Sequence, residues 1–125
     1  YRRLSQIENR HWWFRAIHRL VKDQILRHSR SDPSNSIRIL DAGCGTGGLT
    51  KKISSIGIVV GLDISSRALS LAKKQSPSFV QGSVNKFPFH DGSFDVVTSI
   101  SVLYHRRVDD QSAWKEMKRV RNENV

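Results

Sequence analysis

The chain of 125 residues has room for one hydrophobic core, and its 38% hydrophobic and 26% charged content is ordinary for a globular domain. No apolar run approaches the ~20 residues that a membrane span needs and no secretory leader is recognisable, so we expect no membrane association. The single cysteine, Cys44, cannot form an internal disulfide, which favours a reducing, cytoplasmic setting. Neither a cysteine pair nor the spacing of the histidines suggests a metal site.

Positive charge is concentrated in the first third of the chain. The whole sequence has 21 Lys and Arg residues against 11 Asp and Glu, a net charge of +10. Residues 1–38 alone hold nine basic and three acidic side chains. Two interpretations stay open: an anionic partner such as nucleic acid, or a solvated surface on a basic protein.

Residues 1–36 are predicted to form an N-terminal helix and a linker. Apolar and aromatic side chains recur at three- and four-residue steps from Leu4 to Ile25, which is typical of one face of an amphipathic helix. Residues 29–36 are polar and contain a proline, which indicates a linker. Residues 37–125 would then form the main domain.

Strand and helix patterns alternate through this main domain. Short runs rich in β-branched residues predict strands at residues 37–40, 58–62, 78–80 and 94–97. Helices are predicted at residues 47–55, from a cap at Ser65 or Ser66 to Lys74, and from Asp109 or Asp110 through Val120. Because this alternation builds βαβ units, we expect an α/β fold with a Rossmann-like, doubly wound, mainly parallel sheet of about four strands.

A glycine-rich turn between the first strand and the first helix of this domain is the strongest functional signal. Gly43, Gly45 and Gly48 form a G-x-G-x-x-G pattern, which lets the backbone turn tightly and approach a ligand. Alone, the pattern also suits a nicotinamide dinucleotide. Asp41, two residues before the first glycine, suits a cationic ligand better than a pyrophosphate. Asp63 ends the next strand, where a carboxylate can accept hydrogen bonds from a ribose.

Three stretches, residues 41–47, 61–65 and 87–97, resemble successive motifs of the class I S-adenosylmethionine-dependent methyltransferases, and most closely the type 11 group. Residues 101–120 are similar to that group's segment after the fourth strand. The sequence His-Trp-Trp-Phe at residues 11–14 is similar to an N-terminal signature of bacterial members, some of them linked to glycan biosynthesis.

The resemblance implies S-adenosylmethionine as the cofactor and a set of contacts for it. The implied cofactor-binding residues are Asp41, Gly43, Gly45, Gly47, Asp63, Ile64, Ser83 and Val84. Asp63 would hold the ribose hydroxyls, Ile64 would pack on the adenine, and Ser83 with Val84 would lie beside it. Ser83 departs from the family, which has an acid there. Because a neutral oxygen accepts a weaker hydrogen bond than a carboxylate, we expect a reduced affinity.

Methyl transfer from a sulfonium needs alignment, exclusion of water and, for some acceptors, a base. His105, just past the fourth strand, is the candidate base, with Tyr104 beside it. The alternative is that His105 only orients its loop. Cys44 is interpreted as a small buried side chain rather than a nucleophile.

The resemblance also implies that the fourth strand borders a fifth, which this sequence lacks, so we expect a bare sheet edge. A bare edge favours pairing with a second copy, and we therefore predict a homodimer. The function expected is methyl transfer to a small molecule or glycan precursor. A nucleic-acid methyltransferase and a non-catalytic cofactor-binding module stay open as alternatives.

Overall fold

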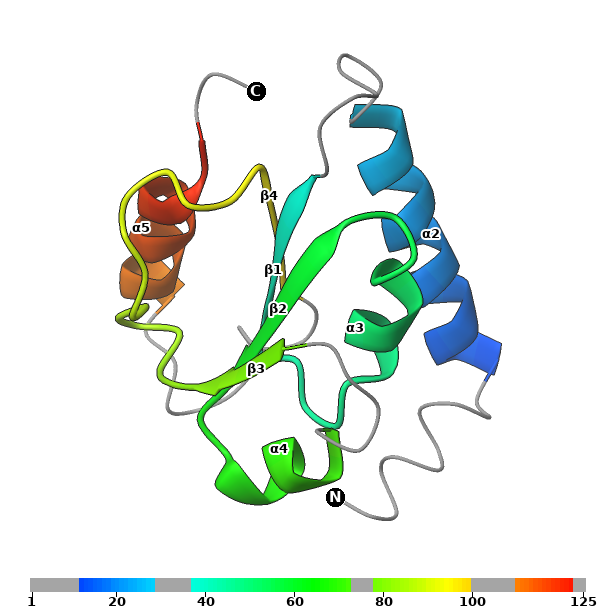
Figure 1. The fold of residues 1–125 in the computed structure, drawn as a ribbon, viewed down its shortest axis with the longest axis horizontal. Coiled ribbons are helices and arrows are strands. Elements are labelled where there is room, and N and C mark those ends of the chain that lie inside the picture. The colour runs from blue at the N-terminus through cyan, green and yellow to red at the C-terminus, as the bar shows by residue number, and fades with distance from the viewer. Residues whose placement is uncertain (1–11, 29–36, 73–77, 100–109, 123–125) are drawn as a thin grey trace.

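The computed structural model describes residues 12–28, 37–72, 78–99 and 110–122. Its centre is a four-stranded, all-parallel sheet with strand order β3-β2-β1-β4. The strands are β1 (Arg38–Ala42), β2 (Ile58–Asp63), β3 (Ser78–Gln81) and β4 (Val96–Thr98). Helices α2 (Trp12–His28) and α3 (Gly48–Ile53) cover one face, and α5 (Asp110–Val120) covers the other (Figure 1). The expected doubly wound α/β fold is confirmed.

The two faces of the sheet carry separate apolar clusters, because successive side chains of a strand point to opposite faces. Leu40, Ala42 and Leu62 pack with Val120 on the α5 face. Ile39 and Val59 pack with Leu49, Ile53 and Ile25 on the face of α2 and α3. The buried β-branched and leucine side chains of β1 and β2 therefore explain why these strands occupy the middle of the sheet.

Helix α2 is the described part of the predicted N-terminal helix. It ends at His28, directly before the predicted linker at residues 29–36, and the residues before Trp12 lie outside the described ranges. The apolar stripe does bury Ile25, and the stripe includes His18, which is also buried. The Nδ1 atom of His18 lies 3.0 Å from the Nζ atom of Lys52 on α3, so the two helices also meet through polar groups.

Helix α4 (Ser66–Ala72) follows β2 and contacts β2 and β3. The capping residue is Ser65, whose Oγ accepts a hydrogen bond from the Ala68 amide at 3.1 Å. An N-terminal serine cap satisfies an amide that has no partner within the helix. Of the two serines that the sequence offered, Ser65 is therefore the cap and Ser66 the first helical residue.

The fourth strand lies two residues later than predicted at its start. Phe94 was expected to begin it, but the backbone of Phe94 pairs with the chain after α5 instead. Its amide donates to Val120 O at 2.9 Å, and its carbonyl accepts from the Asn122 amide at 2.6 Å. The expectation of a bare outer edge is therefore wrong at Phe94. Val96 and Val97 pack on opposite faces, as the strand pattern predicts.

Arg38, the first residue of β1, and Asp95, directly before β4, fix the position of this fourth strand. Asp95 accepts hydrogen bonds from the Arg38 amide at 2.9 Å and from the Arg38 guanidinium at 3.3 Å. Burial by itself would raise the pKa of Asp95, but these hydrogen bonds outweigh it and lower the pKa below its usual value. The carboxylate thus stays ionised and holds β4 beside β1.

Candidate functional site

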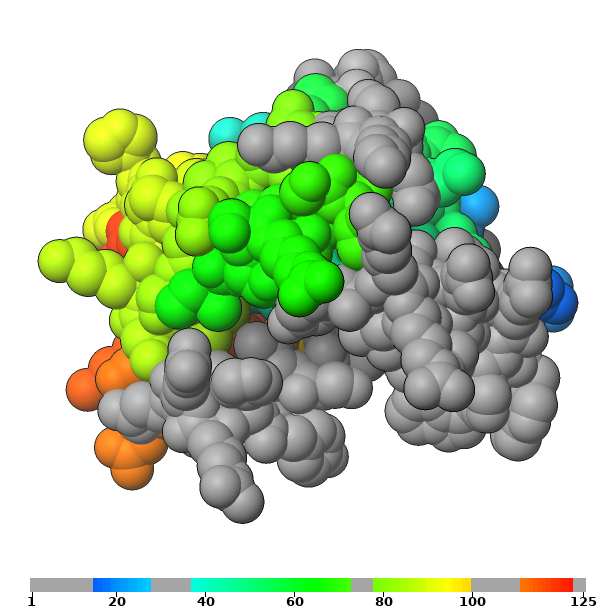
Figure 2. Space-filling model, turned by 90° about the horizontal axis from the view of Figure 1, so that it is seen from below, coloured from blue at the N-terminus to red at the C-terminus, as the bar shows by residue number. Residues whose placement is uncertain are grey.

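The carboxyl ends of the four parallel strands lie at one edge of the sheet. Figure 2 shows this edge from below, with the side chains of α4 at its centre and those of the loop after β3 to their left. In open α/β sheets, ligands bind outside the carboxyl ends of the strands. The glycine-rich loop and Asp63 both lie at this edge, so the position agrees with the sequence prediction.

The glycine-rich loop turns sharply as it leaves β1. The amides of Gly43 and Cys44 both donate to Leu62 O, at 2.7 and 2.9 Å, which ties the loop to the end of β2. Gly47 has φ +86° and a β-carbon there would lie 3.1 Å from Cζ of Phe79, so a side chain is excluded by strain and by space. Gly45 has φ +58°, but a β-carbon there would meet nothing within 4 Å. The loop is therefore open at Gly45, where a ligand could approach the backbone.

Asp63 joins the glycine-rich loop to the start of α4. Its Oδ2 accepts a hydrogen bond from the Gly45 amide at 2.9 Å, and its Oδ1 accepts one from the Ser65 amide at 2.9 Å. Each carboxylate oxygen has a second lone pair, and the side chain is only half-buried. Asp63 therefore fixes the loop and can still accept hydrogen bonds from a bound diol.

Ile64, the next residue, presents an apolar surface beside this carboxylate. It is 56% exposed, which is unusual for isoleucine next to a polar site. Its carbonyl accepts a hydrogen bond from Gln81 Nε2 at 3.1 Å, so the backbone beneath the side chain is held in place. An exposed apolar side chain on this held backbone suits packing against a flat ring.

Asp41 is buried rather than open to the edge. Its side chain is 3% exposed, and its Oδ2 accepts a hydrogen bond from Thr50 Oγ1 on α3 at 2.7 Å. The carboxylate therefore connects the end of β1 to α3 beneath the glycine-rich loop. Whether it also faces the cofactor stays a prediction.

Ser83 and Val84 form the start of a tight turn after β3. The Asn85 amide donates to Ser83 Oγ at 3.1 Å, and the Lys86 amide donates to Ser83 O at 3.3 Å. Val84 is 7% exposed and belongs to the apolar cluster on the α5 face, so little of it can reach a ligand. The Ser83 hydroxyl keeps one lone pair for a further hydrogen bond.

Two predicted catalytic residues, Tyr104 and His105, lie outside the described residues. Cys44 is described and buried, as expected for a small apolar side chain. Within the described ranges, no three His, Cys, Asp or Glu side chains lie close enough together to hold a metal ion. Among the same residues, no helix is long and apolar enough to span a membrane.

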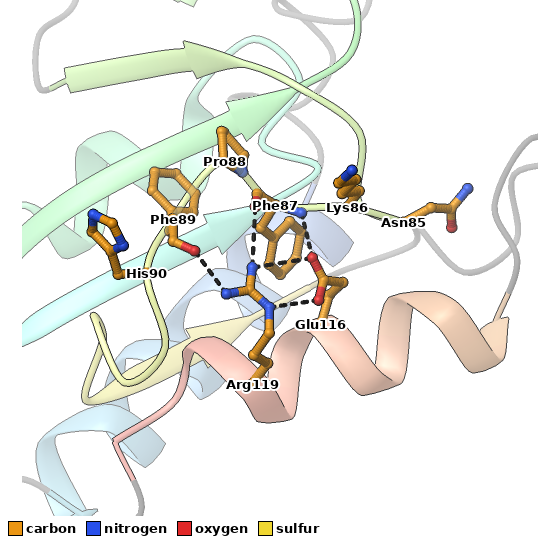
Figure 3. Close-up of a pocket in the computed structure, with 8 residues that line it drawn as sticks. All are labelled: Asn85, Lys86, Phe87, Pro88, Phe89, His90, Glu116 and Arg119. Atoms are coloured by element: carbon orange, nitrogen blue, oxygen red, sulfur yellow. Dashed lines mark hydrogen bonds and ion pairs between the residues drawn. The ribbon is translucent and has the colours of Figure 1, made fainter.

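One polar pair of α5 was not predicted as part of any site. Arg119 Nε donates to Glu116 Oε2 at 2.7 Å, and the two side chains line a pocket of about 520 Å³ with the loop after β3 (Figure 3). The hydrogen bond from Arg119 lowers the pKa of Glu116, while Glu116 and Asp91 raise the pKa of Arg119. The three-residue spacing predicts the pair within the helix, but no sequence pattern predicts its contacts with a loop nearly 30 residues earlier.

Comparison with known proteins gives consistent matches along the chain. The sequence profile described as a methyltransferase domain matches residues 40–124. The demethylmenaquinone methyltransferase of Staphylococcus aureus is 35% identical over 111 residues, which are 82% of this chain and 43% of that protein. The malonyl-[acyl-carrier protein] O-methyltransferase of Erwinia pyrifoliae is 35% identical over 82 residues, 63% of this chain and 30% of that protein. The chain thus spans less than half of each relative.

A solved structure extends the likeness to the fold. The crystal structure of a putative S-adenosylmethionine-dependent methyltransferase from Methanococcus maripaludis matches with a TM-score of 0.78 at 20% identity. The match covers 97% of this chain and 57% of the other. At this identity the likeness supports the arrangement of strands and helices.

Proposed function

The chain belongs to the methyltransferase-domain family, and from this premise we propose that it transfers the methyl group of S-adenosylmethionine to a small-molecule acceptor. Membership implies S-adenosylmethionine as the cofactor. The single observation that supports the proposal best is the 2.9 Å hydrogen bond between the Gly45 amide and Asp63 Oδ2. It brings the glycine-rich loop of β1 and the acidic end of β2 together at the carboxyl edge of the sheet.

The residues at this edge fit the cofactor. The open space at Gly45 leaves room for a ligand against the backbone, and Asp63 keeps acceptor capacity for the ribose hydroxyls. The exposed side chain of Ile64 offers a surface for the adenine ring, and the Ser83 hydroxyl an acceptor for its amino group. Gly43 and Gly47 complete the proposed binding set, with the largely buried Val84 and Asp41 behind it.

The cofactor, when bound, supplies a methyl group on a sulfonium, which is already activated for transfer. This chain's task is then to hold the donor in line with the acceptor and to exclude water. For an oxygen or nitrogen acceptor, we propose His105 as the base and Tyr104 as its neighbour. Both proposals rest on the position of these residues just past the fourth strand in the sequence.

The class of acceptor is proposed from the relatives. The two curated relatives above are named for a quinone precursor and for a malonyl group on a carrier protein. Neither name is that of a nucleic acid, which favours a small-molecule acceptor here, and a glycan precursor stays within that class.

Calorimetric titration with S-adenosylmethionine and with S-adenosylhomocysteine tests the proposal. We expect both to bind with one site per chain. An acceptor screen with methyl-labelled cofactor follows, and it separates an enzyme from a non-catalytic binding module. A folded chain that binds neither compound would refute the proposal.

A nucleic-acid acceptor is the second candidate, and the surface of α2 favours it. Arg15, Arg19 and Arg27 are exposed there, and Lys51 is exposed on the neighbouring α3. Contacts between such side chains and phosphates make affinity fall steeply with salt. Salt-dependent binding of a short RNA or DNA, together with labelling of that nucleic acid, would favour this candidate over the first.

We also propose a cytoplasmic location and a homodimer. The proposal of a dimer rests on the outer edge of β4 at Val96–Thr98, for which the described residues provide no strand partner besides β1. Light scattering over a concentration series at physiological salt is the measurement. A monomer at high micromolar concentration would exclude the dimer. A charged residue at Val97 is a poor probe, because its side chain packs against the core.

A further inference from the structure

The backbone of Phe87, in the loop between β3 and β4, is held on both sides by side chains of α5. Its amide donates to Glu116 Oε1 at 2.7 Å, and its carbonyl accepts from Arg119 Nη2 at 3.1 Å (Figure 3). Arg119 Nη1 also donates to Phe89 O at 2.8 Å. We call the two side chains of α5 the Glu116–Arg119 clamp. The side chains of the clamp hold the loop by hydrogen bonds to its backbone amide and carbonyl groups, which are the groups that a neighbouring strand would otherwise bind.

Arg119 is saturated by these contacts. A guanidinium has five N–H donors. Two of them reach the Glu116 carboxylate, one reaches Asp91 Oδ1 at 2.8 Å, and two reach the backbone carbonyls of Phe87 and Phe89. No donor remains for a phosphate or carboxylate ligand in the neighbouring pocket. The role of Arg119 is therefore to position the loop.

The clamped residue adjoins the turn that is proposed to face the adenine. Phe87 directly follows the turn at residues 83–86, and it is buried in the same cluster as Val84. At its other end the turn is fixed to β2, because the Gly82 amide donates to Asp63 O at 3.0 Å. One end of the turn is thus bonded to the end of β2 and the other end to the clamp, so the position of Ser83 depends on both contacts.

We propose that Glu116 and Arg119 are positioning residues that set Ser83 against the adenine half of the cofactor, an inference that rests on the proposed function. They act through the backbone of Phe87 and do not touch the ligand. Loss of the clamp frees one end of the turn, so the Ser83 hydroxyl no longer has a fixed place. The consequence is a loss of selectivity for the base, beyond any general loss of stability.

Base selectivity gives a readout that a merely structural role would leave unchanged. The test compares the affinities for S-adenosylhomocysteine and for its purine-riboside analogue, in which a hydrogen atom replaces the adenine amino group. The Ser83 hydroxyl can both donate and accept hydrogen bonds, and this hydrogen atom offers it no partner of either kind. One hydrogen bond to Ser83 predicts a preference for adenine of roughly 3- to 10-fold in the unaltered chain. Because both affinities fall together when part of the protein unfolds, their ratio is insensitive to stability.

The variants are Arg119→Ala, Arg119→Lys and Glu116→Gln. The controls are Lys118→Ala, at an exposed position of the same helix, and Ile53→Ala, which loosens the separate apolar cluster on the opposite face of the sheet. We expect the ratio to fall to about one or two in Arg119→Ala, with a smaller fall in the other two. Lysine retains the charge but lacks the planar fork, so it restores part of the ratio. Both controls should keep the ratio.

The outcomes separate this inference from the proposed function. If the unaltered chain prefers adenine and the clamp variants keep the full preference, the inference is wrong while the proposed function stands. If the unaltered chain binds neither compound, the proposed function fails and the inference fails with it. Should Arg119→Ala not fold, Arg119→Lys and Glu116→Gln decide the question by the same ratio.

Discussion

Replacing Asp63 by alanine removes the group on which the proposed binding site depends. In the structure its carboxylate accepts two backbone hydrogen bonds, from Gly45 and from Ser65, both at 2.9 Å. Alanine leaves both amides without this acceptor and leaves a bound ribose without a charged partner. The variant should therefore lose stability and cofactor affinity, and the two losses have different origins.

The size of each loss follows from the contacts. Asp63 is half-buried, so water can reach the two amides, and we expect the free energy of unfolding to fall by about 1–3 kcal/mol. The ribose hydroxyls lose a charged acceptor within a bound complex, for which we expect about 1.5–3 kcal/mol, or roughly 10- to 150-fold in Kd. Asp63→Asn is the matched variant. It keeps one acceptor oxygen but places an amide donor near one of the two backbone amides.

The assay is calorimetric titration with S-adenosylhomocysteine, on protein shown to be folded by circular dichroism. Thermal melts with and without ligand measure the stability loss separately. We expect Asp63→Asn to lie between the unaltered chain and Asp63→Ala in both measurements. A folded Asp63→Ala with an unchanged Kd would show that Asp63 does not contact the cofactor, and the proposed site would be wrong.

Three further substitutions test other parts of the site. Ser83→Asp should tighten S-adenosylhomocysteine binding several-fold in calorimetry, because a carboxylate accepts a stronger hydrogen bond than a hydroxyl; equal or weaker binding would contradict the adenine placement. Thr50→Val removes the 2.7 Å donor to buried Asp41 and should lower the free energy of unfolding by about 1–3 kcal/mol in urea titration; an unchanged midpoint would contradict it. The pKa of Glu116 is lowered in the folded chain, so its stabilising contribution is complete above its unfolded value near ~4.3 and is lost as pH falls through the folded value. Melting temperatures between pH 6 and 3 should therefore fall less steeply for Glu116→Gln, and parallel curves would contradict this.

Much of the fold was predictable because its signals are local. The short apolar runs predict each strand within two residues of its start, since a buried strand needs little more than consecutive side chains that fit both faces. A serine cap at Ser65 or Ser66 was predictable for the same local reason, and the structure shows that the cap is Ser65. The pairing of a glycine-rich loop with an acidic strand end was predicted for the same reason. The glycine-rich loop directly follows the end of β1 in the sequence, and Asp63 is the last residue of β2.

The sequence could not determine which groups meet across long separations. The contact of Glu116 and Arg119 with the loop at Phe87 joins positions about 30 residues apart, and it needs α5 to lie against that loop. The pairing of Phe94 with the chain after α5 moved the start of β4, because backbone groups pair with whichever strand lies nearest in space. Asp41 shows the same limit.

At Asp41, the sequence by itself determined only that a carboxylate ends the first strand. That its side chain is buried and bonded to Thr50 depends on α3 packing over the carboxyl end of β1. A local pattern reports the conformation of neighbouring residues, whereas burial and hydrogen-bond partners are set when separate elements pack together. The tertiary structure alone therefore decided that Asp41 supports the loop from beneath while Asp63 lies at its open side.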